Sequence, residues 1–401
     1  MAPGNRPPLA RRVAGLGTSV FAEFSALAVE HQAVNLGQGF PDFDGPDAVK
    51  EAAVQAIREG VNQYAVSMGA PALRKAIADH AERFYGMRVD PATMVAVTSG
   101  ATEAIFDAIL GTVDPGDEVI LFEPFYDSYV ASVEMAGGVP RFVRLQPPGP
   151  GQGAWWFDRA ELEAAFSGKT RLVLVNTPHN PTGKVYTREE LELIGELCRR
   201  HGALVLSDEV YEHIVYAPAK HVRTATLPGL WDRTITISSA GKTFSCTGWK
   251  IGWAIAPPPL RQAVQSTHQF VTFATASPFQ AAVAAALRLP DAYFQELGAA
   301  YRAKRDRLVQ ALNACGLKAS LPEGSYFAMA DIRPFGFADD FEFCRHLTRE
   351  VGVAAIPPSA FYGEAHRADG RAMARFAFCK TDAVLAAAKQ RLAALRPRAT
   401  S

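Results

Sequence analysis

The feature that most constrains the fold is a series of short apolar runs that begins at Met94 and continues to Ala256, with helical stretches between the runs. Several runs consist almost entirely of Val, Ile and Leu, a pattern typical of strands buried on both faces of a parallel sheet. The predicted strands cover residues 94–98, 118–122, 139–145, 171–176, 203–207, 234–238 and 252–256. We therefore expect an α/β fold with a mainly parallel, seven-stranded sheet sandwiched by helices.

Amphipathic periodicity and end signals predict helices between these strands and before them. The helices cover residues 20–31, 47–59, 70–85, 102–112, 187–201 and 278–289. A long helix from Asp291 past Arg307 leads into a second region, where residues 325–332 and 373–378 alternate as half-buried strands and residues 382–395 form a final helix. The expected organisation is an N-terminal arm that belongs in part to the small domain (1–45), a large domain (46–295) and a smaller α+β domain (296–401).

Charge and cysteine usage exclude several classes of partner. The 401 residues carry 41 basic and 41 acidic side chains, so no net field attracts nucleic acid or an anionic membrane. No apolar run reaches membrane-spanning length. The five cysteines are scattered and form no C-x-x-C pair, and the histidines lack ligand spacings such as H-E-x-x-H, which argues against disulfides and a zinc site. We expect a cytoplasmic protein that holds no metal.

Lys242 stands out among the lysines because of its position. It follows a β-branched run at residues 234–237 and lies among small and apolar residues, with Lys250 further along the same segment. Partial desolvation disfavours the ammonium form, so the neutral amine becomes available as a nucleophile that can form a Schiff base with an aldehyde. A solvated surface charge is the ordinary alternative for a lysine.

Polar residues also follow three other predicted strands, at the edge where open parallel sheets bind ligands. Ser99-Gly100 leads directly into a helix whose exposed N–H groups form a phosphate site, with a helix cap by Ser99 as the structural alternative. The segment 180–183 reads Asn-Pro-Thr-Gly, which is also good turn chemistry. Asp208 follows a mostly apolar run, and a buried carboxylate needs a partner.

Together these features describe a site for a phosphorylated aromatic aldehyde. A helix N-terminus and Lys250 hold the phosphate, Asp208 faces a ring nitrogen, an Asn and a Tyr address a phenolic oxygen, and Lys242 forms the imine. Pyridoxal 5′-phosphate is the cofactor for which a lysine Schiff base and an aspartate partner to the ring nitrogen are the recurring protein groups. It is therefore the expected cofactor.

The order of several motifs along the chain resembles that of the fold-type I, class I/II aminotransferases. The motifs are N-L-G-Q-G-F-P-D (35–42), N-Q-Y (62–64), E-P-F-Y-D-S-Y (123–129), N-P-T-G (180–183), D-E-V-Y (208–211), the segment around Lys242 and R-F-A-F-C-K (375–380). They are most similar to the branch that contains kynurenine, glutamine and methionine aminotransferases and actinobacterial N-succinyldiaminopimelate aminotransferases. The resemblance spans roughly residues 15–395.

The resemblance implies a cofactor role for each matching residue. Lys242 would form the Schiff base and then move a proton as general base and acid. Asp208 would keep the ring nitrogen protonated, and Tyr211 and Asn180 would hydrogen-bond the phenolic oxygen. Tyr126 would stack on the ring, with a core aromatic as the alternative. The phosphate contacts would come from Gly100, Ala101, Thr102, Ser239 and Lys250.

The resemblance also implies a homodimer in which two subunits share each active site. Arg375 would bind the substrate α-carboxylate bidentately, with Gly39 and Asn180 assisting. Tyr64 would reach the phosphate of the neighbouring subunit, and Phe273 would border that subunit's substrate pocket.

Two positions depart from the pattern of kynurenine aminotransferases. Phe21 would line the side-chain pocket where those enzymes commonly carry Trp, and Ala274 stands where some of them have His. Both departures weaken an assignment of kynurenine as the substrate.

The expected activity is that of an aminotransferase (EC 2.6.1.-) that moves an amino group from an L-amino acid to a 2-oxo acid by a ping-pong mechanism. The aromatic residues Phe21, Tyr126 and Phe273 suggest an apolar or amphipathic donor such as methionine, glutamine or an aromatic, kynurenine-like amino acid. N-succinyl-LL-2,6-diaminopimelate, of lysine biosynthesis, is the alternative donor. β-Elimination from a cysteine S-conjugate is an alternative reaction of the same cofactor, because both reactions begin with the same proton removal.

Three other classes of protein fit the sequence less well. A P-loop enzyme needs a glycine where Thr236 stands. A dinucleotide-dependent dehydrogenase needs a third glycine and a preceding strand, which the segments 15–17 and 37–39 lack. A transcriptional regulator built on an aminotransferase-like module needs a fused helix-turn-helix region. Only about twenty residues precede the segment that resembles aminotransferases, which is too few for such a region.

Overall fold

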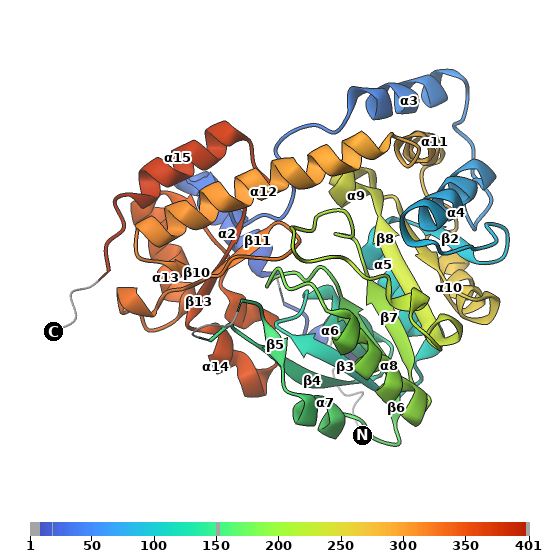
Figure 1. The fold of residues 1–401 in the computed structure, drawn as a ribbon, viewed down its shortest axis with the longest axis horizontal. Helices are drawn as coiled ribbons and strands as arrows, with labels where there is room; N and C mark the ends of the chain where they lie inside the picture. Colours follow the sequence, from blue (N-terminus) through green and yellow to red (C-terminus); the bar gives the residue numbers. More distant parts are fainter. Residues whose placement is uncertain (1–8, 18, 150–152, 398–401) are drawn as a thin grey trace, which may run out of the picture.

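Eight strands form the central sheet, in the order β2-β9-β8-β7-β6-β3-β4-β5 (Figure 1). The computed structural model describes residues 9–17, 19–149 and 153–397. The strands are β2 (Val95–Thr98), β3 (Glu118–Glu123), β4 (Val139–Gln146), β5 (Trp156–Phe157), β6 (Thr170–Asn176), β7 (Leu204–Asp208), β8 (Thr234–Ser239) and β9 (Gly252–Ile255). Strands β4, β3, β6, β7 and β8 are parallel, whereas β9 is antiparallel to both of its neighbours.

The predicted fold class is confirmed, with one additional strand. All seven predicted strands form, and β5 adds an eighth at the edge, antiparallel to β4. Because β5 contains only two residues, it is too short to show an alternating pattern in the sequence.

The central strands are buried on both faces, as their apolar composition predicts. Every residue of β3, β7 and β8 is buried. Leu121 and Leu206 pack toward α5 (Gly100–Thr112), α6 (Ser128–Met135) and α10 (Pro258–Val271), whereas Ile120 and Val205 pack toward α7 (Arg159–Ala165) and α8 (Arg188–His201). Consecutive residues of a strand point to opposite faces, so one strand serves both layers.

Local signals explain where the helices begin and end. Thr187 and Glu190 form a capping box at the start of α8, and Gly202 ends that helix in the left-handed conformation. The other helices are α1 (Arg11–Ala14), α2 (Val20–Glu30), α3 (Asp47–Arg58), α4 (Pro71–Tyr85), α9 (Ala240–Thr243), α11 (Ser277–Ala286), α12 (Asp291–Ala314), α13 (Asp340–His346), α14 (Arg367–Gly370) and α15 (Asp382–Leu392). No helix within the described ranges has the length and apolar character needed to cross a membrane.

A second, antiparallel sheet lies beside the first and contains β10 (Lys318–Ala319), β11 (Phe327–Asp331) and β13 (Met373–Ala377). Helices α12 and α15 run across this part of the molecule (Figure 1). The N-terminal segment joins it, because β1 (Val34–Asn35) pairs with β12 (Val353–Ala354) and Phe24 lies in the same core. The division into residues 1–45, 46–295 and 296–401 stays a prediction.

The expectation of half-buried strands in this region is wrong. Every residue of β11 is buried. Ala328 and Ala330 pack with the core of the small sheet, while Met329 packs with the core on one face of the central sheet. The strand alternates between two apolar environments, so its second face does not meet solvent.

Gly111 allows α5 to approach α10 closely, and Gly111→Ala should therefore destabilise the protein. A Cβ atom at Gly111 would lie 2.5 Å from the Ala263 carbonyl oxygen, which belongs to the backbone of α10. Overpacking of this kind costs about 1–3 kcal/mol. The matched control is Gly298→Ala in α12, where the nearest atom would be 4.0 Å away, so the variant should gain about 0.5–1 kcal/mol from helix propensity. Urea titrations of both variants at one protein concentration measure the two free energies of unfolding, and equal shifts would contradict the packing argument.

Candidate active site

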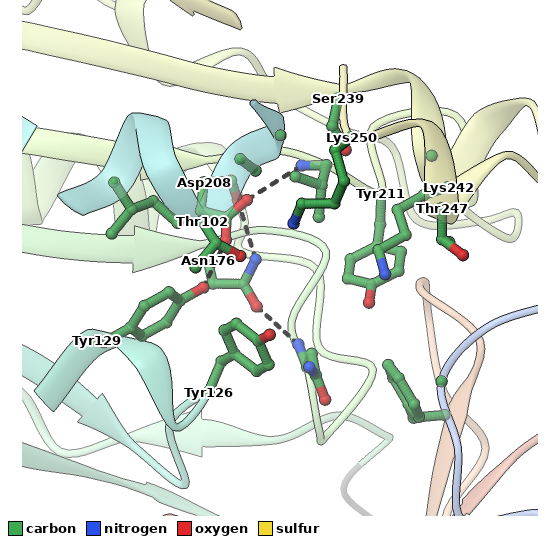
Figure 2. A pocket seen from close by; sticks show the side chains of 18 of the residues that line it. Thr102, Tyr126, Tyr129, Asn176, Asp208, Tyr211, Ser239, Lys242, Thr247 and Lys250 are labelled. Carbon is green, nitrogen blue, oxygen red and sulfur yellow. Dashed lines mark hydrogen bonds between the residues drawn. The ribbon is translucent and has the colours of Figure 1, made fainter. Parts of the chain in front are cut away.

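A cavity of about 240 Å³ lies at the carboxyl ends of the parallel strands, between the two sheets (Figure 2). All the predicted site residues except Tyr64 and Phe273 line it. They are Phe21, Gly39, Gly100, Ala101, Thr102, Tyr126, Asn180, Asp208, Tyr211, Ser239, Lys242, Lys250 and Arg375. The chain thus brings together residues from the N-terminal segment, from successive strand ends and from β13.

Lys242 lies on the short helix α9 that follows β8, and its side chain reaches the cavity (Figure 2). Its ammonium group has no hydrogen bond or ion pair with any residue that the structure describes, and the nearest rings are those of Tyr211 and Tyr326, at 5.8 and 5.9 Å. Burial lowers the pKa of Lys242. The neutral amine is therefore more accessible here than on a surface lysine.

Asp208 ends β7 as a buried carboxylate with two hydrogen-bond donors. Tyr129 Oη donates to Asp208 Oδ2 at 2.6 Å, and the Val210 N–H donates to Oδ1 at 3.3 Å. Burial raises the pKa of Asp208 to about 6, while the Tyr129 hydrogen bond and the charge of Lys242 oppose that rise. The carboxylate can hold a proton on a basic ring atom in the cavity.

Asn176 connects the ends of two neighbouring strands. It lies opposite Asp208 in the β6–β7 register, and its Nδ2 donates to the Asp208 carbonyl at 3.0 Å. Its Oδ1 accepts from the Asn180 N–H at 2.7 Å. Asn176 therefore fixes the backbone of Asn180, whose side chain is thereby held at the cavity wall.

The N-terminus of α5 and Lys250 lie together at one wall of the cavity, where they could hold an anion. Ser99 is the N-cap residue of α5, as the alternative interpretation expects, but its side chain makes no cap hydrogen bond. Among the described residues, the Ser99 side chain therefore does not occupy the first N–H groups of α5, which can face a ligand. Gly100 has φ +81°, and a Cβ atom there would lie 3.1 Å from Lys250 Nζ. A glycine at this position allows the lysine to approach the helix end.

Arg375 is a buried cation that has no anionic partner among the described residues. Its residue is 1% exposed, its Nη1 donates to Asn180 Oδ1 at 3.1 Å, and its Nη2 donates to the Gly37 carbonyl at 2.6 Å. Its Nε has no partner, and it forms no ion pair with any described residue. The guanidinium faces the rings of Phe327 and Phe21, at 4.3 and 5.0 Å. Burial lowers the pKa of Arg375 to about 10. A carboxylate ligand would offset the free-energy cost of burying the charged guanidinium.

Gly39 is required by close packing against the small sheet. A Cβ atom at Gly39 would lie 2.6 Å from the ring of Phe327. Tyr326 Oη donates to the Gly39 carbonyl at 2.7 Å. The segment that carries Gly39 is thereby held against β11, on the side of the cavity that Arg375 occupies.

Tyr64 and Phe273 lie outside the cavity. Their side chains are exposed, at 83% and 48%, and their rings meet edge to face at 5.3 Å. Ala274 does not line the cavity either. Their predicted contributions to a neighbouring subunit therefore stay predictions.

Sequence reasoning missed nine residues that line the cavity, namely Gln38, Ile105, Tyr129, Asn176, Val210, Gly241, Thr247, Ile251 and Phe327. Several of them lie within motifs or segments already singled out. Tyr129 belongs to the segment 123–129, Gln38 to the segment 35–42, and Thr247 to the segment around Lys242. Asn176 is the last residue of β6, and Phe327 is the first residue of β11. The residues that lie opposite them are set by the pairing register of the strands, which the sequence does not show. Gln38 Nε2 donates to the Phe21 carbonyl at 3.2 Å, so it ties α2 to the cavity wall.

The arrangement as a whole combines four chemical functions in one cavity. It contains an amine of lowered pKa, a buried carboxylate, an anion site at a helix N-terminus and an unpaired guanidinium. Such a set can hold a phosphorylated aldehyde and the carboxylate of an amino acid at the same time.

Comparison with known proteins identifies the family. The family model described as "Aminotransferase class I and II" matches residues 31–392. A probable N-succinyldiaminopimelate aminotransferase of Mycobacterium tuberculosis is 47% identical over 96% of this chain and 98% of the relative. A kynurenine–oxoglutarate transaminase of Dictyostelium discoideum is 43% identical over 96% of both chains, and the methionine aminotransferase of Escherichia coli is 42% identical over 94% of this chain and 96% of the relative.

Solved structures agree with the sequence matches. The N-succinyldiaminopimelate aminotransferase from M. tuberculosis superposes with a TM-score of 0.93 at 47% identity, covering 96% of this chain and 99% of that one. The E. coli methionine aminotransferase superposes with a TM-score of 0.91 at 42% identity, covering 97% of this chain and 100% of that one. These matches confirm the resemblance: the chain belongs to the aminotransferase class I and II family and is a fold-type I aminotransferase.

Proposed function

We propose that the chain is a pyridoxal-phosphate-dependent aminotransferase that moves an amino group from an L-amino acid to a 2-oxo acid in a ping-pong reaction centred on Lys242. The observation that carries the proposal is the buried Arg375 guanidinium, which has no anionic partner within the part of the chain that the structure describes and lines the same cavity as Lys242. A buried charge needs a counter-charge. The α-carboxylate of an amino-acid substrate would supply this counter-charge at Arg375, with the amino group of the substrate facing Lys242.

The other cavity residues suit pyridoxal phosphate. Gly100, Ala101 and Thr102, at the start of α5, would hold the phosphate together with Ser239 and Lys250. Tyr126 would stack on the ring, and Asn180 and Tyr211 would donate hydrogen bonds to its phenolic oxygen. When bound, the cofactor supplies an aldehyde carbon that accepts the amino group and a ring that withdraws electrons from the substrate Cα.

Lys242 would attach the cofactor and then move the proton. Once the substrate amine has displaced it, the freed amine can take the proton from the substrate Cα and return it at the cofactor C4′. The lowered pKa of Lys242 favours its neutral form, which is the form that accepts a proton. Its lack of hydrogen bonds to described residues leaves the side chain able to reach both atoms.

Asp208 would keep a proton on the ring nitrogen. The hydrogen bond from Tyr129 orients the carboxylate and favours its ionised form. We assign Tyr129 a positioning role, because it acts on the ring through Asp208.

The cavity favours a donor with an uncharged side chain. Among the described residues that line it, the basic ones are Lys242, Lys250 and Arg375. The first two are assigned to the cofactor and the third to the α-carboxylate, which leaves no cation for a second carboxylate. Together with the aromatic rings of Phe21 and Tyr126, this favours methionine, glutamine or an aromatic amino acid.

Two alternatives keep the same site. N-succinyldiaminopimelate, named for the M. tuberculosis relative, carries further carboxylates and would need a cation from outside the described lining. β-Elimination from a cysteine S-conjugate would use the same Lys242 proton transfer and release pyruvate and ammonia without a 2-oxo acid acceptor.

The active site would be completed by a second copy of the chain. Tyr64, Phe273 and Phe270 are exposed, and Phe270 is the most exposed of them at 86%. Large apolar side chains grouped in this way favour an interface. A homodimer in which Tyr64 reaches the partner's phosphate and Phe273 borders the partner's substrate pocket accounts for their exposure.

A cytoplasmic location accords with five free cysteines.

Arg375→Lys should lower kcat/KM for methionine by at least about 100-fold, mainly through a higher KM. The lysine keeps the positive charge but loses the planar fork that makes two charge-assisted hydrogen bonds. Steady-state kinetics with varied methionine measure the effect. The matched control is Arg333→Lys, an exposed arginine paired with Asp331 next to the same sheet, which should leave kcat/KM unchanged. An unchanged KM in Arg375→Lys would mean that another group binds the carboxylate.

Phe270→Asp should dissociate the dimer and lower cofactor retention, because a charge in an apolar interface lacks a partner. Light scattering after size-exclusion chromatography measures the mass, and visible absorbance measures retained cofactor. Val29→Asp, at a position on α2 that is 78% exposed, is the control and should stay dimeric. A monomeric wild-type protein with full cofactor content would contradict the shared site.

A further inference from the structure

A second group of titratable side chains lies behind the first turn of α5, outside the lining of the cavity. Glu103 and Asp107 belong to α5 and His268 belongs to α10, and these two helices pack against each other. His268 Nδ1 lies 3.0 Å from Glu103 Oε1 and 3.9 Å from Asp107 Oδ2. The Asp107 and His268 side chains are 0% exposed, and that of Glu103 is 8% exposed. We call these three residues the α5–α10 cluster.

The hydrogen bond of His268 Nε2 determines which group can lie between His268 Nδ1 and the Glu103 carboxyl group. His268 Nε2 is 2.9 Å from the Ser67 carbonyl oxygen. A carbonyl only accepts, so Nε2 carries the hydrogen and donates it. In the neutral ring, Nδ1 then directs a lone pair at the Glu103 carboxylate. Either a proton, carried by Nδ1 or by the carboxyl group, or a metal ion must therefore lie between these two atoms.

Asp107 distinguishes a metal ion from a proton. Neither of its carboxylate oxygens has a hydrogen-bond partner among the described residues, although the side chain is fully buried. A proton on Nδ1 reaches Glu103, but 3.9 Å is too far for a hydrogen bond to Asp107. A divalent ion would take one ligand atom from each side chain, and these atoms all lie within 4.8 Å of one another.

We propose that Glu103, Asp107 and His268 bind a divalent transition-metal ion of the Zn²⁺ type through one nitrogen and two carboxylate groups. The ion displaces the proton from His268 Nδ1 and completes its coordination with water. The Ser67 carbonyl then fixes the ring tautomer, as outer partners of metal-binding histidines do. The inference goes beyond the proposed function, because the ion would tie α5 and α10 to the segment around Ser67 without taking part in amino transfer.

A second cluster in the molecule shows why this one is favoured. His80, Glu212 and His213 also bring their ligand atoms together. There, Glu212 forms an ion pair with Arg223 and accepts a hydrogen bond from Ser238 Oγ at 2.5 Å. A guanidinium already neutralises that carboxylate and would repel a divalent cation. In the α5–α10 cluster, none of the described arginine or lysine side chains forms an ion pair with Glu103 or Asp107.

The experiment is a Zn²⁺ titration of tag-free holoenzyme that has been treated with EDTA and dialysed. Calorimetry should give one Zn²⁺ per chain, and elemental analysis should find it after removal of free metal. Asp107→Asn keeps the shape of the side chain and should weaken Zn²⁺ binding at least about 10-fold. Asp114→Asn, an exposed acid just beyond the end of α5, is the control and should bind as the wild type does. Absence of binding to the wild type, or equal binding by Asp107→Asn, would overturn the proposal.

Two further measurements separate this site from other causes of binding. X-ray absorption at the zinc edge of the loaded wild-type protein should show nitrogen and oxygen ligands, and sulfur ligands would overturn the proposal because they would place the ion on a cysteine. Without metal, Asp107→Asn should melt at or above the wild-type temperature, since it removes an unpartnered buried carboxylate. A lower melting temperature without metal would mean that Asp107 has a structural partner, which also contradicts the proposal.

Discussion

Positive charge that has no anionic partner among the described residues, held in a partly enclosed cavity, is the constraint on which the rest of the structure depends. Arg375 is buried among aromatic rings with neutral oxygens as its hydrogen-bond acceptors, and Lys242 has no acceptor among the described residues. Burying such charges costs free energy unless a ligand supplies a counter-charge. The fold offsets this cost through packing elsewhere, chiefly in strands buried on both faces, and the resulting cavity presents positive charge in two places.

The two sheets contribute different halves of this site. The carboxyl ends of the parallel strands supply the anion site, Asp208 and Lys242, while β13 and the N-terminal segment supply Arg375 and Gly39. Glycine at position 39 and the Tyr326 hydrogen bond hold the second half against the first. The distance between the amine and the guanidinium is therefore set by the packing of one sheet on the other, which is where changes in donor preference would arise.

The sequence was sufficient for features that depend on local pattern. Val, Ile and Leu runs predicted the central strands, and the position of Lys242 after one of them predicted a desolvated amine. Features that depend on register or on distant helices were not predictable in this way. Asn176 faces Asp208 only through the pairing of β6 with β7, and β11 is buried on both faces because a second core covers it. The α5–α10 cluster joins Glu103 to a histidine 165 residues away, so no ligand spacing could show it.

The most direct test of the central claim is a single half-reaction of the holoenzyme with methionine in the absence of any 2-oxo acid. Amino transfer centred on Lys242 predicts one equivalent of 2-oxo acid per chain, released as the visible absorbance of the cofactor disappears. Lys242→Ala, in folded form, should release none. Continued release beyond one equivalent, or full release by Lys242→Ala, would contradict the account, because either result requires chemistry that does not store the amino group through this lysine.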